Sequence, residues 1–401
     1  MIGATIILAF REIRRNPMRS ILTTLGIMIG VASVIAMVTL GRSVTARITA
    51  DIASMGTNLL IVAPGAERHG PVSSTASAFT MNDVVAIERE SGAVDKVAPT
   101  ASSSALVVCG NSNWNTTIQG STNEFFEVRG YKFAQGEGFT ETQLQAGLPV
   151  CVIGETVRRE LFGQQDPVGS TVRIGTITFT VTGLTASKGK AAMGPDQDDL
   201  VVIPVVTFQR RIAGNTDINS ILVSALTSAK TALAKGQVEA LMRERRHIAA
   251  GQVDDFSVED MKEMGTMLTN VTTVLTALLG AIAGVSLIVG GIGIMNIMLV
   301  SVTERTREIG IRLSIGARER EVLLQFLVEA VTLSVFGGMI GILLGIALSF
   351  GGAIAFGMPF GLKPDIVVIA ILFSGAVGVG FGYVPARKAS RLNPIDALRH
   401  E

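Results

Sequence analysis

The densest group of charged side chains lies in the segment 304–321, directly after a long uncharged run. Five arginines alternate there with glutamates and with the apolar residues Ile309, Ile311, Leu313 and Ile315. Apolar side chains on a charged loop are typical of a surface that binds another protein. The alternative is a solvated turn that only fixes the topology of the chain. The candidate docking residues are Glu304, Arg305, Arg307, Glu308, Ile309, Gly310, Arg312 and Gly316.

The spacing within this segment predicts a short helix. Thr303 is a suitable residue to cap its first turn, and Glu308 and Arg312 are four residues apart, which lets them pair on one face. Gly316 suits the left-handed conformation that commonly ends a helix. We expect the next helix to begin at Ala317.

Residues for catalysis, nucleotide binding or metal binding are missing from the sequence. No GxxxxGK[ST] run occurs in the 401 residues, so they contain no Walker A loop. The three histidines, His69, His247 and His400, are dispersed, and no Ser/His/Asp, Cys/His or HExxH arrangement rises above chance. We therefore expect no enzyme activity, no metal and no cofactor bound by this chain. Any energy source must bind from outside.

The composition is that of an integral membrane protein with a sizeable soluble part. Apolar residues make up 48% of the chain, there are 44 glycines, and the charges occur in blocks between apolar runs. The net charge of +1 gives no reason to expect nucleic acid as a partner. The only cysteines, Cys109 and Cys151, fall in a segment that we place outside the cytoplasm, where a disulfide could form. Two buried free thiols are the alternative.

Four apolar segments are long enough to cross a bilayer, which takes roughly 20 residues. The basic residues beside them predict that both termini and the 304–321 segment lie in the cytoplasm. The crossings lack ionisable residues in their middles, which argues against ion-coupled transport.

The expected order is a cytoplasmic interfacial helix at 1–19, a first membrane helix with an outward extension at 20–56, an extracytoplasmic domain at 57–255, a second extension and membrane helix at 256–303, a cytoplasmic loop at 304–327, a third membrane helix at 328–350, an external loop at 351–365, a fourth membrane helix at 366–384 and a cytoplasmic tail at 385–401.

The segment 256–303 is expected to be one long helix, with Ser257 and Asp260 forming a capping box at its start. Such a helix would be roughly 70 Å long, against about 30 Å of hydrocarbon, so part of it must stand outside the membrane as a stalk. The first membrane helix extends outward in the same way and offers it a partner. The predicted seam between the two follows alternating steps of three and four residues through Met261, Met264, Leu268, Val271 and Leu275.

Glycines spaced four residues apart predict close approach between helix backbones in the membrane. They are Gly26 and Gly30, Gly280 and Gly284, Gly337, Gly341 and Gly345, and Gly378 and Gly382. Asn296 is the one strong polar amide in the crossings, and we expect it to form a hydrogen bond between helices.

The segment 57–255 reads as a soluble α+β domain. Runs such as Val150–Ile153, Thr171–Ile174 and Ser220–Ala225 have strand character, whereas Glu155–Phe162 and Lys230–Arg246 have helical patterns. The predicted fold is therefore an α-helical membrane protein with four transmembrane helices, two of them extended outward as a stalk, and an α+β extracytoplasmic domain.

Three segments resemble the MacB/FtsX superfamily of ABC-transporter permeases, and the resemblance covers nearly the whole chain. Gly293–Arg305 followed by Arg307–Arg312 looks like the segment between the second and third helices of macrolide-exporter-type permeases. Pro385–Ala389 with Asn393-Pro394 is similar to their C-terminal tail, and Val152–Gly169 is similar to their extracytoplasmic core domain.

This resemblance implies a homodimer in the cell inner membrane, driven by two copies of an ABC ATPase that holds ATP and Mg²⁺. It implies mechanotransmission, in which closure of the ATPase at the 304–321 loop moves the stalk and the outer domain. MacB itself has its ATPase fused ahead of the permease. Because this chain begins at the interfacial helix, we expect a separate ATPase polypeptide.

The resemblance leaves several functions open. Efflux of a hydrophobic drug, peptide or lipid-like substrate, with a periplasmic adaptor protein and an outer-membrane channel, is the first hypothesis. Lipoprotein release is a close alternative. An FtsX-like regulator that activates a cell-wall hydrolase without transport is a third.

Overall fold

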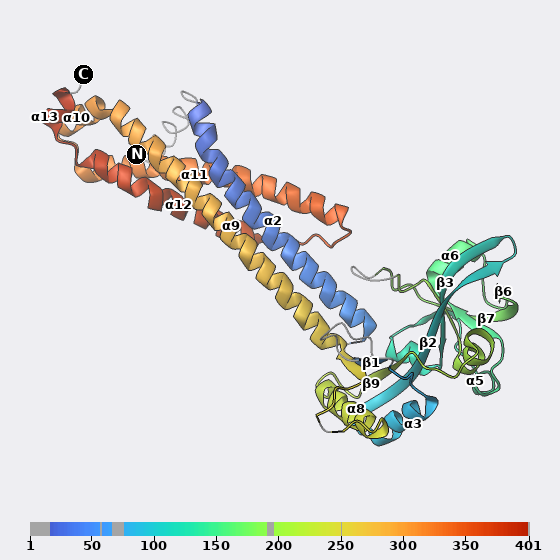
Figure 1. The fold of residues 1–401 in the computed structure, drawn as a ribbon. Helices are drawn as coiled ribbons and strands as arrows, with labels where there is room; N and C mark the ends of the chain where they lie inside the picture. The colour runs from blue at the N-terminus through green and yellow to red at the C-terminus, as the bar shows by residue number, and fades with distance from the viewer. Residues whose placement is uncertain (1–16, 57, 66–75, 191–195, 250, 400–401) are drawn as a thin grey trace. The chain divides into compact units, whose positions relative to one another are not determined.

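The computed structural model describes residues 17–56, 58–65, 76–190, 196–249 and 251–399. It divides into a helical unit, Met1–Arg47 with Asn270–Glu401, and an α+β unit, Ile48–Thr269. Two long helices, α2 (Pro17–Met55) and α9 (Met261–Glu304), contribute residues to both units and are drawn in blue and yellow in Figure 1. The interfacial helix predicted for 1–19 lies mostly outside the described residues, and Pro17 is already the first residue of α2.

The structure contains four helices that could span a membrane, as predicted. Besides α2 and α9, the helical unit contains α11 (Glu319–Ala355) and α12 (Pro364–Ser390), and all four helices are long and apolar enough to span a membrane. Two short helices complete it, α10 (Thr306–Ser314) after α9 and α13 (Pro394–Arg399) after α12. The crossings predicted at 328–350 and 366–384 are the central parts of longer helices.

Several of the predicted glycines lie where helix backbones approach closely. A Cβ atom on Gly290 of α9 would lie 2.8 Å from the carbonyl carbon of Gly26 in α2, and one on Gly341 of α11 would lie 2.7 Å from the carbonyl oxygen of Met28. These positions tolerate no side chain without a shift of backbone. Gly280 and Gly284 differ, because no atom of another residue lies within 4 Å of the position that a Cβ would take.

The predicted start of the second long helix is wrong. Residues Phe256–Asp260 form strand β10, which pairs antiparallel with β1 (Leu59–Pro64), and α9 begins at Met261. The carboxylate of Asp260, not the hydroxyl of Ser257, accepts the hydrogen bond from the Lys262 N–H at 2.8 Å. Residues 256–260 therefore form a strand although they include residues typical of a helix cap. Pairing with β1 provides hydrogen-bond partners for the backbone N–H and C=O groups of this segment.

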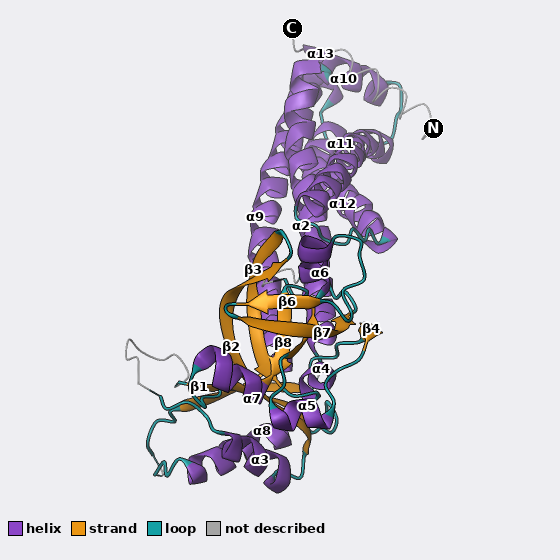
Figure 2. Cartoon of the chain, turned by 90° about the vertical axis from the view of Figure 1, so that its right-hand side faces the viewer, coloured by secondary structure: helices purple, strands orange, loops and turns teal. Residues whose placement is uncertain are grey.

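The α+β unit is built on one ten-stranded sheet, seen in orange in Figure 2. The strand order is β10-β1-β9-β2-β3-β8-β5-β7-β4, and β6 pairs with β2 and β7. The remaining strands are β2 (Val94–Cys109), β3 (Ser112–Ser121), β4 (Phe133–Gly136), β5 (Val150–Ile153), β6 (Thr171–Ile174), β7 (Ile177–Thr185), β8 (Leu200–Pro204) and β9 (Ser220–Ala225). The helices are α3 (Met81–Glu90), α4 (Glu124–Val128), α5 (Glu141–Ala146), α6 (Glu155–Phe162), α7 (Val205–Phe208) continued by a π-helical turn (Gln209–Ala213), and α8 (Thr231–Arg245).

Strand β2 connects two halves of this unit, each with its own core. Its first part pairs with β9 and its second part pairs with β3, so one strand belongs to both halves. One core contains Phe79, Ile87 and Phe256, and the other contains Ile118, Phe179 and Phe208. The α+β class predicted for 57–255 is confirmed, although α4, α5, β4 and β10 were not expected as such.

The two cysteines are free thiols in the structure. Cys151 lies fully buried in β5, between β7 and β8, whereas Cys109 is half-buried at the turn between β2 and β3. Burial raises the pKa of both thiols, and most strongly that of Cys151. The alternative of two free thiols therefore holds, and the disulfide does not.

Counting thiols tests this assignment. In protein unfolded without reductant, Ellman's reagent should detect two thiols per chain. In folded protein at pH 8, Cys109 should react slowly and Cys151 should not react, because only the thiolate of an accessible cysteine is a nucleophile. Detection of no thiol after unfolding without reductant would show that the disulfide exists.

Two alanine substitutions on α9 test the glycine contacts. Gly290→Ala should lower the unfolding temperature, because the methyl group collides with the backbone of α2 and overpacking typically costs about 1–3 kcal/mol. Gly280→Ala is the matched control. It brings the same gain in helix propensity, but the added methyl group enters open space. Thermal unfolding of both variants in detergent should separate them, and equal unfolding temperatures would contradict the close contact.

Candidate functional site

The charged segment forms a compact helical corner, which we call the α10 hairpin, residues 304–321. Helix α9 ends at Glu304, α10 runs from Thr306 to Ser314, and α11 begins at Glu319. The predicted cap is wrong, because the Thr303 hydroxyl donates to the Val300 carbonyl at 2.7 Å and Arg305 occupies the N-cap position. Gly316 has a φ of +106°, so the predicted left-handed end of the helix is correct.

One face of α10 is buried against other helices. Ile309 is 2% exposed and belongs to the core that contains Val322 and Phe326 of α11. A Cβ on Gly310 would lie 2.7 Å from the Cβ of Ala397 in α13, so α13 packs directly on α10. Ile309 and Gly310, which the sequence suggested as docking residues, are therefore internal packing residues that hold the hairpin in place.

Polar contacts link the hairpin to α11. Arg312 donates a hydrogen bond from Nη1 to Gln325 Oε1 at 2.9 Å and pairs through Nη2 with Glu308, four residues earlier. Arg305 Nη1 lies 3.7 Å from Glu329 Oε2, and only 10% of the Glu329 side chain is exposed. A carboxylate this buried requires a partner, so Arg305 ties the corner between α9 and α10 to α11.

The opposite face of α10 is exposed. Ile311 is 42% exposed and Ile315 is 82% exposed. Arg307, Arg318 and Arg320 are exposed around them. Of the predicted docking residues, Ile309 and Gly310 are therefore internal, Arg305 and Arg312 are partly buried, and Glu304, Arg307, Glu308 and Gly316 are exposed together with Ile311 and Ile315.

The predicted seam does not face α2. Met261 is buried in the α+β unit, whereas Met264, Leu268, Val271 and Leu275 are 38% to 56% exposed. Helix α2 instead meets another face of α9. The Cβ positions of Gly265 on α9 and of Gly30 and Gly41 on α2 lie within 3 Å of Ile52, Leu287 and Thr276 respectively. The contact residues on α9 are spaced eleven apart, or about three helical turns.

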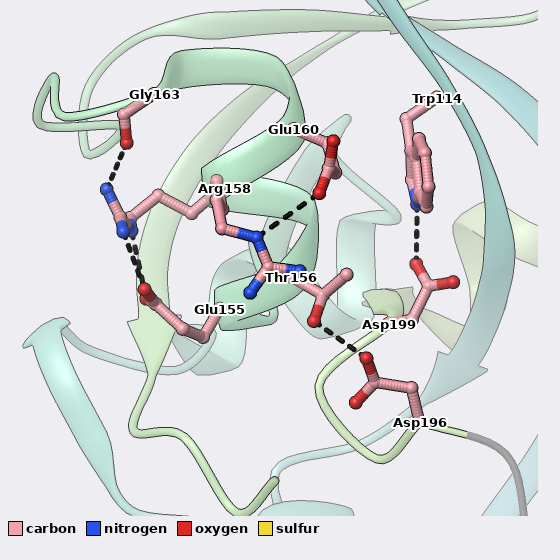
Figure 3. A network of polar contacts seen from close by, with 9 residues as sticks. Trp114, Glu155, Thr156, Arg158, Glu160, Gly163, Asp196 and Asp199 are labelled. Atoms are coloured by element: carbon pink, nitrogen blue, oxygen red, sulfur yellow. Dashed lines mark hydrogen bonds and ion pairs between the residues drawn. The ribbon is translucent and has the colours of Figure 1, made fainter. Parts of the chain in front are cut away.

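The segment resembling the extracytoplasmic core domain forms a polar network around α6, shown in Figure 3. Thr156 donates to Asp196 at 2.9 Å, and the Trp114 indole donates to Asp199 at 2.8 Å. Arg158 pairs with Glu155 and lowers the pKa of that carboxyl. The Thr156 bond fastens the loop before β8 to α6, and the Trp114 bond fastens the same loop to β3. Among the described residues, no group of His, Cys, Asp and Glu is arranged to hold a metal ion.

Two family matches cover most of the chain. Residues 20–241 match the MacB-like periplasmic core domain, and residues 280–394 match the FtsX-like permease C-terminal region. The unmatched residues between them, 242–279, include β10 and the first part of α9, and the α10 hairpin lies within the second match.

Relatives with known names give the same result. "Macrolide export ATP-binding/permease protein MacB" of Chlorobium luteolum is 44% identical over 396 residues, and that of Syntrophobacter fumaroxidans is 39% identical over 450 residues. Both alignments cover 98% of this chain but only 59% and 63% of the relatives, so the chain spans about three fifths of their length.

A solved structure, the periplasmic region of MacB from Actinobacillus actinomycetemcomitans, aligns with a TM-score of 0.47 and 23% identity, over 55% of this chain and 96% of that one. The match to the MacB-like periplasmic core domain alone extends over more than half of the 401 residues. With four helices able to span a bilayer and a MacB-like periplasmic domain, the chain belongs to the MacB/FtsX superfamily of ABC-transporter permeases.

Proposed function

We propose that this chain is the inner-membrane permease subunit of an ABC transporter, which conveys the motion of a separate ATPase to its periplasmic domain. The observation that carries this proposal is the two-sided α10 hairpin. Its internal face is fixed by Ile309 and Gly310, while Ile311 and Ile315 face outward among arginines. A rigidly mounted, exposed apolar surface is what a partner needs in order to push on a helix.

The ATPase supplies the nucleotide chemistry. The 401 residues contain no Walker A loop, so ATP and Mg²⁺ are bound by the ATPase and not by this chain. Two copies of the ATPase dock on the α10 hairpins of a permease homodimer. The basic residues of the hairpin support a cytoplasmic position for it and for both termini.

Helices α2 and α9 carry the motion outward as a stalk. Both contribute to the helical unit and to the α+β unit, and at 39 and 44 residues they are longer than the roughly 20 that a crossing needs. Their backbones meet at Gly26 and Gly290, so the two helices move together. Substrate does not cross the lipid in this mechanism.

A second copy of the chain covers the exposed stripe of α9. Apolar residues with exposed side chains recur on one face from Met264 to Val300, roughly 54 Å of helix against about 30 Å of hydrocarbon. The hydrocarbon core of a bilayer is therefore too thin to cover the whole exposed stripe of α9. Asn296 is exposed on the same stripe, where a side-chain amide can pair with its counterpart and fix the register of two helices.

Efflux is the favoured outcome of this motion, with a hydrophobic drug, peptide or lipid-like molecule as substrate, a periplasmic adaptor and an outer-membrane channel. The names of the relatives in Chlorobium luteolum and Syntrophobacter fumaroxidans, which refer to macrolide export, support efflux over lipoprotein release or hydrolase regulation. If an envelope hydrolase co-purified with the chain in place of an adaptor, hydrolase regulation would be favoured over efflux.

Substitution of Ile315 tests the docking surface. Ile315→Asp should weaken binding of the ATPase by about tenfold or more, because an apolar side chain buried on association is replaced by a charge. Val253→Asp is the control, since Val253 is also 82% exposed but lies in the α+β unit. Binding is measured with detergent-solubilised permease and the purified ATPase. Equal affinities of the two variants would remove the α10 hairpin as the docking site.

Disulfide crosslinking tests the homodimer. In a chain without native cysteines (Cys109→Ser, Cys151→Ala), Leu275→Cys should give covalent dimers on oxidation in membranes, because Leu275 lies on the exposed stripe of α9. Thr276→Cys should not, since Thr276 faces Gly41 of its own chain. Absence of dimers from both Leu268→Cys and Leu275→Cys would exclude α9 as the dimer contact.

A further inference from the structure

The α+β unit contains a pocket of about 450 Å³ that none of the functions above uses. It lies between α4, β4 and the turn before α5, and we call it the α4–β4 pocket. Its walls include the aromatic residues Phe126, Tyr131, Phe133 and Phe139 and the carboxylates of Glu127 and Glu137. None of the residues lining it is basic.

The walls of the pocket are fixed before any ligand binds. The Asn123 side chain accepts a hydrogen bond from the Phe139 N–H at 2.9 Å and donates one to the Phe139 carbonyl at 2.7 Å. On the other side, Gly136 has a φ of +67°, and a Cβ there would lie 2.2 Å from the Thr182 carbonyl oxygen. A preformed pocket loses less free energy to ordering when a ligand enters.

The aromatic residues form one connected group. The ring centroid of Phe126 lies 5.0 Å from that of Phe133 and 6.0 Å from that of Phe139. Phe126 is buried, whereas Phe133 is 37% exposed and presents an aromatic ring to an incoming molecule. Aromatic faces attract cations, but the Lys188 ammonium already occupies one face of Tyr131, 4.5 Å from the ring centre, so Phe133 is the ring that a ligand can reach.

The two carboxylates at the pocket differ in their pairing. Glu127 forms an ion pair with Lys96. Glu137 is exposed and forms no ion pair with any other residue that the structure describes. Glu137 therefore provides a negative charge beside the aromatic group, and the two together suit a ligand that is both apolar and positively charged.

We propose that the α4–β4 pocket binds a hydrophobic organic cation, such as a bulky molecule with a protonated amine or an onium group. The aromatic rings contact its apolar body and Glu137 neutralises its charge. Binding itself does not depend on the mechanism above. Only the assignment of the pocket as a site for the transported substrate rests on the proposed function.

The pocket also lies beside the end of α2. A Cβ on Gly56, the residue that follows α2, would lie 3.1 Å from the Val128 carbonyl of α4. Met55, the last residue of α2, packs against the apolar cluster that contains Phe126 and Phe139. A shift of α2 would therefore move one wall of the pocket, so that a bound cation and the long helix affect each other.

Direct binding tests this proposal without the ATPase. The full chain in nanodiscs of zwitterionic lipid is dialysed to equilibrium against tetraphenylphosphonium, and tetraphenylborate serves as an anion of nearly the same shape. Glu137→Gln and Phe133→Ala should each weaken phosphonium binding by about tenfold. Glu141→Gln, an equal loss of charge on nearby α5, should leave it unchanged.

Three results would overturn the proposal. Phosphonium binding equal to that of empty nanodiscs would exclude the site. Equal affinities of the parent, Glu137→Gln and Phe133→Ala chains would place the binding elsewhere. Tetraphenylborate that binds as tightly and responds to Phe133→Ala in the same way would show an apolar pocket without preference for cations. Unfolding temperatures confirm that the variants are folded, and loss of export with intact phosphonium binding would count against the proposed function alone.

Discussion

The packing of α13 on α10 decides which face of the charged hairpin another protein can reach. Gly310 leaves no space between α10 and Ala397, and Ile309 fills the adjacent core, so the hairpin is part of the helical unit and not a loose loop. The Arg305–Glu329 ion pair adds a polar contact between the hairpin and α11 in which both side chains are largely buried. In the mechanism that we propose, this mounting passes a force applied at Ile311 and Ile315 on to α9 and α11.

Helix α9 has two faces that differ in their surroundings. On the face toward α2, Gly290 and Gly265 allow close approach between the two helices. On the other face, apolar residues remain exposed over a greater length than a bilayer can cover. Tight contact within the chain and an uncovered stripe outside it are what a helix needs if it is to transmit motion in a homodimer.

Much of the fold could be predicted from local patterns. The strands Val150–Ile153, Thr171–Ile174 and Ser220–Ala225 and the helix Glu155–Phe162 occur as predicted, since their apolar periodicity is unambiguous and turn residues bound them. Phe256–Asp260 was misread because its helix-capping residues are a local signal, whereas its pairing with β1 joins residues far apart in the sequence. The predicted seam on α9 failed for a related reason. In a helix that is apolar on most sides, apolar residues at steps of three and four can be found on several faces. The face that contacts α2 is the one that carries Gly265 and Gly290.

The candidate site was only partly visible in the sequence for the same physical reason. The Glu308–Arg312 pair and the end of the helix at Gly316 depend on neighbours within one or two turns, and both are present. The burial of Ile309 depends on contacts with residues beyond the hairpin, including Phe326 of α11, and the packing of Gly310 depends on α13 near the end of the chain. The α4–β4 pocket likewise joins α4 to β4 and to Tyr131, and β4 was too short to be recognised.

The most direct test of the proposed transfer of motion measures whether the α10 hairpin moves as a rigid part of the helical unit. Spin labels at Ser314 and Leu324, both exposed, report the distance between α10 and α11, and labels at Leu268 report the distance between the α9 helices of two copies. When the ATPase and a non-hydrolysable ATP analogue are added, the first distance should stay constant and the second should change. A change in the first distance with none in the second would show that the hairpin yields and transmits no motion.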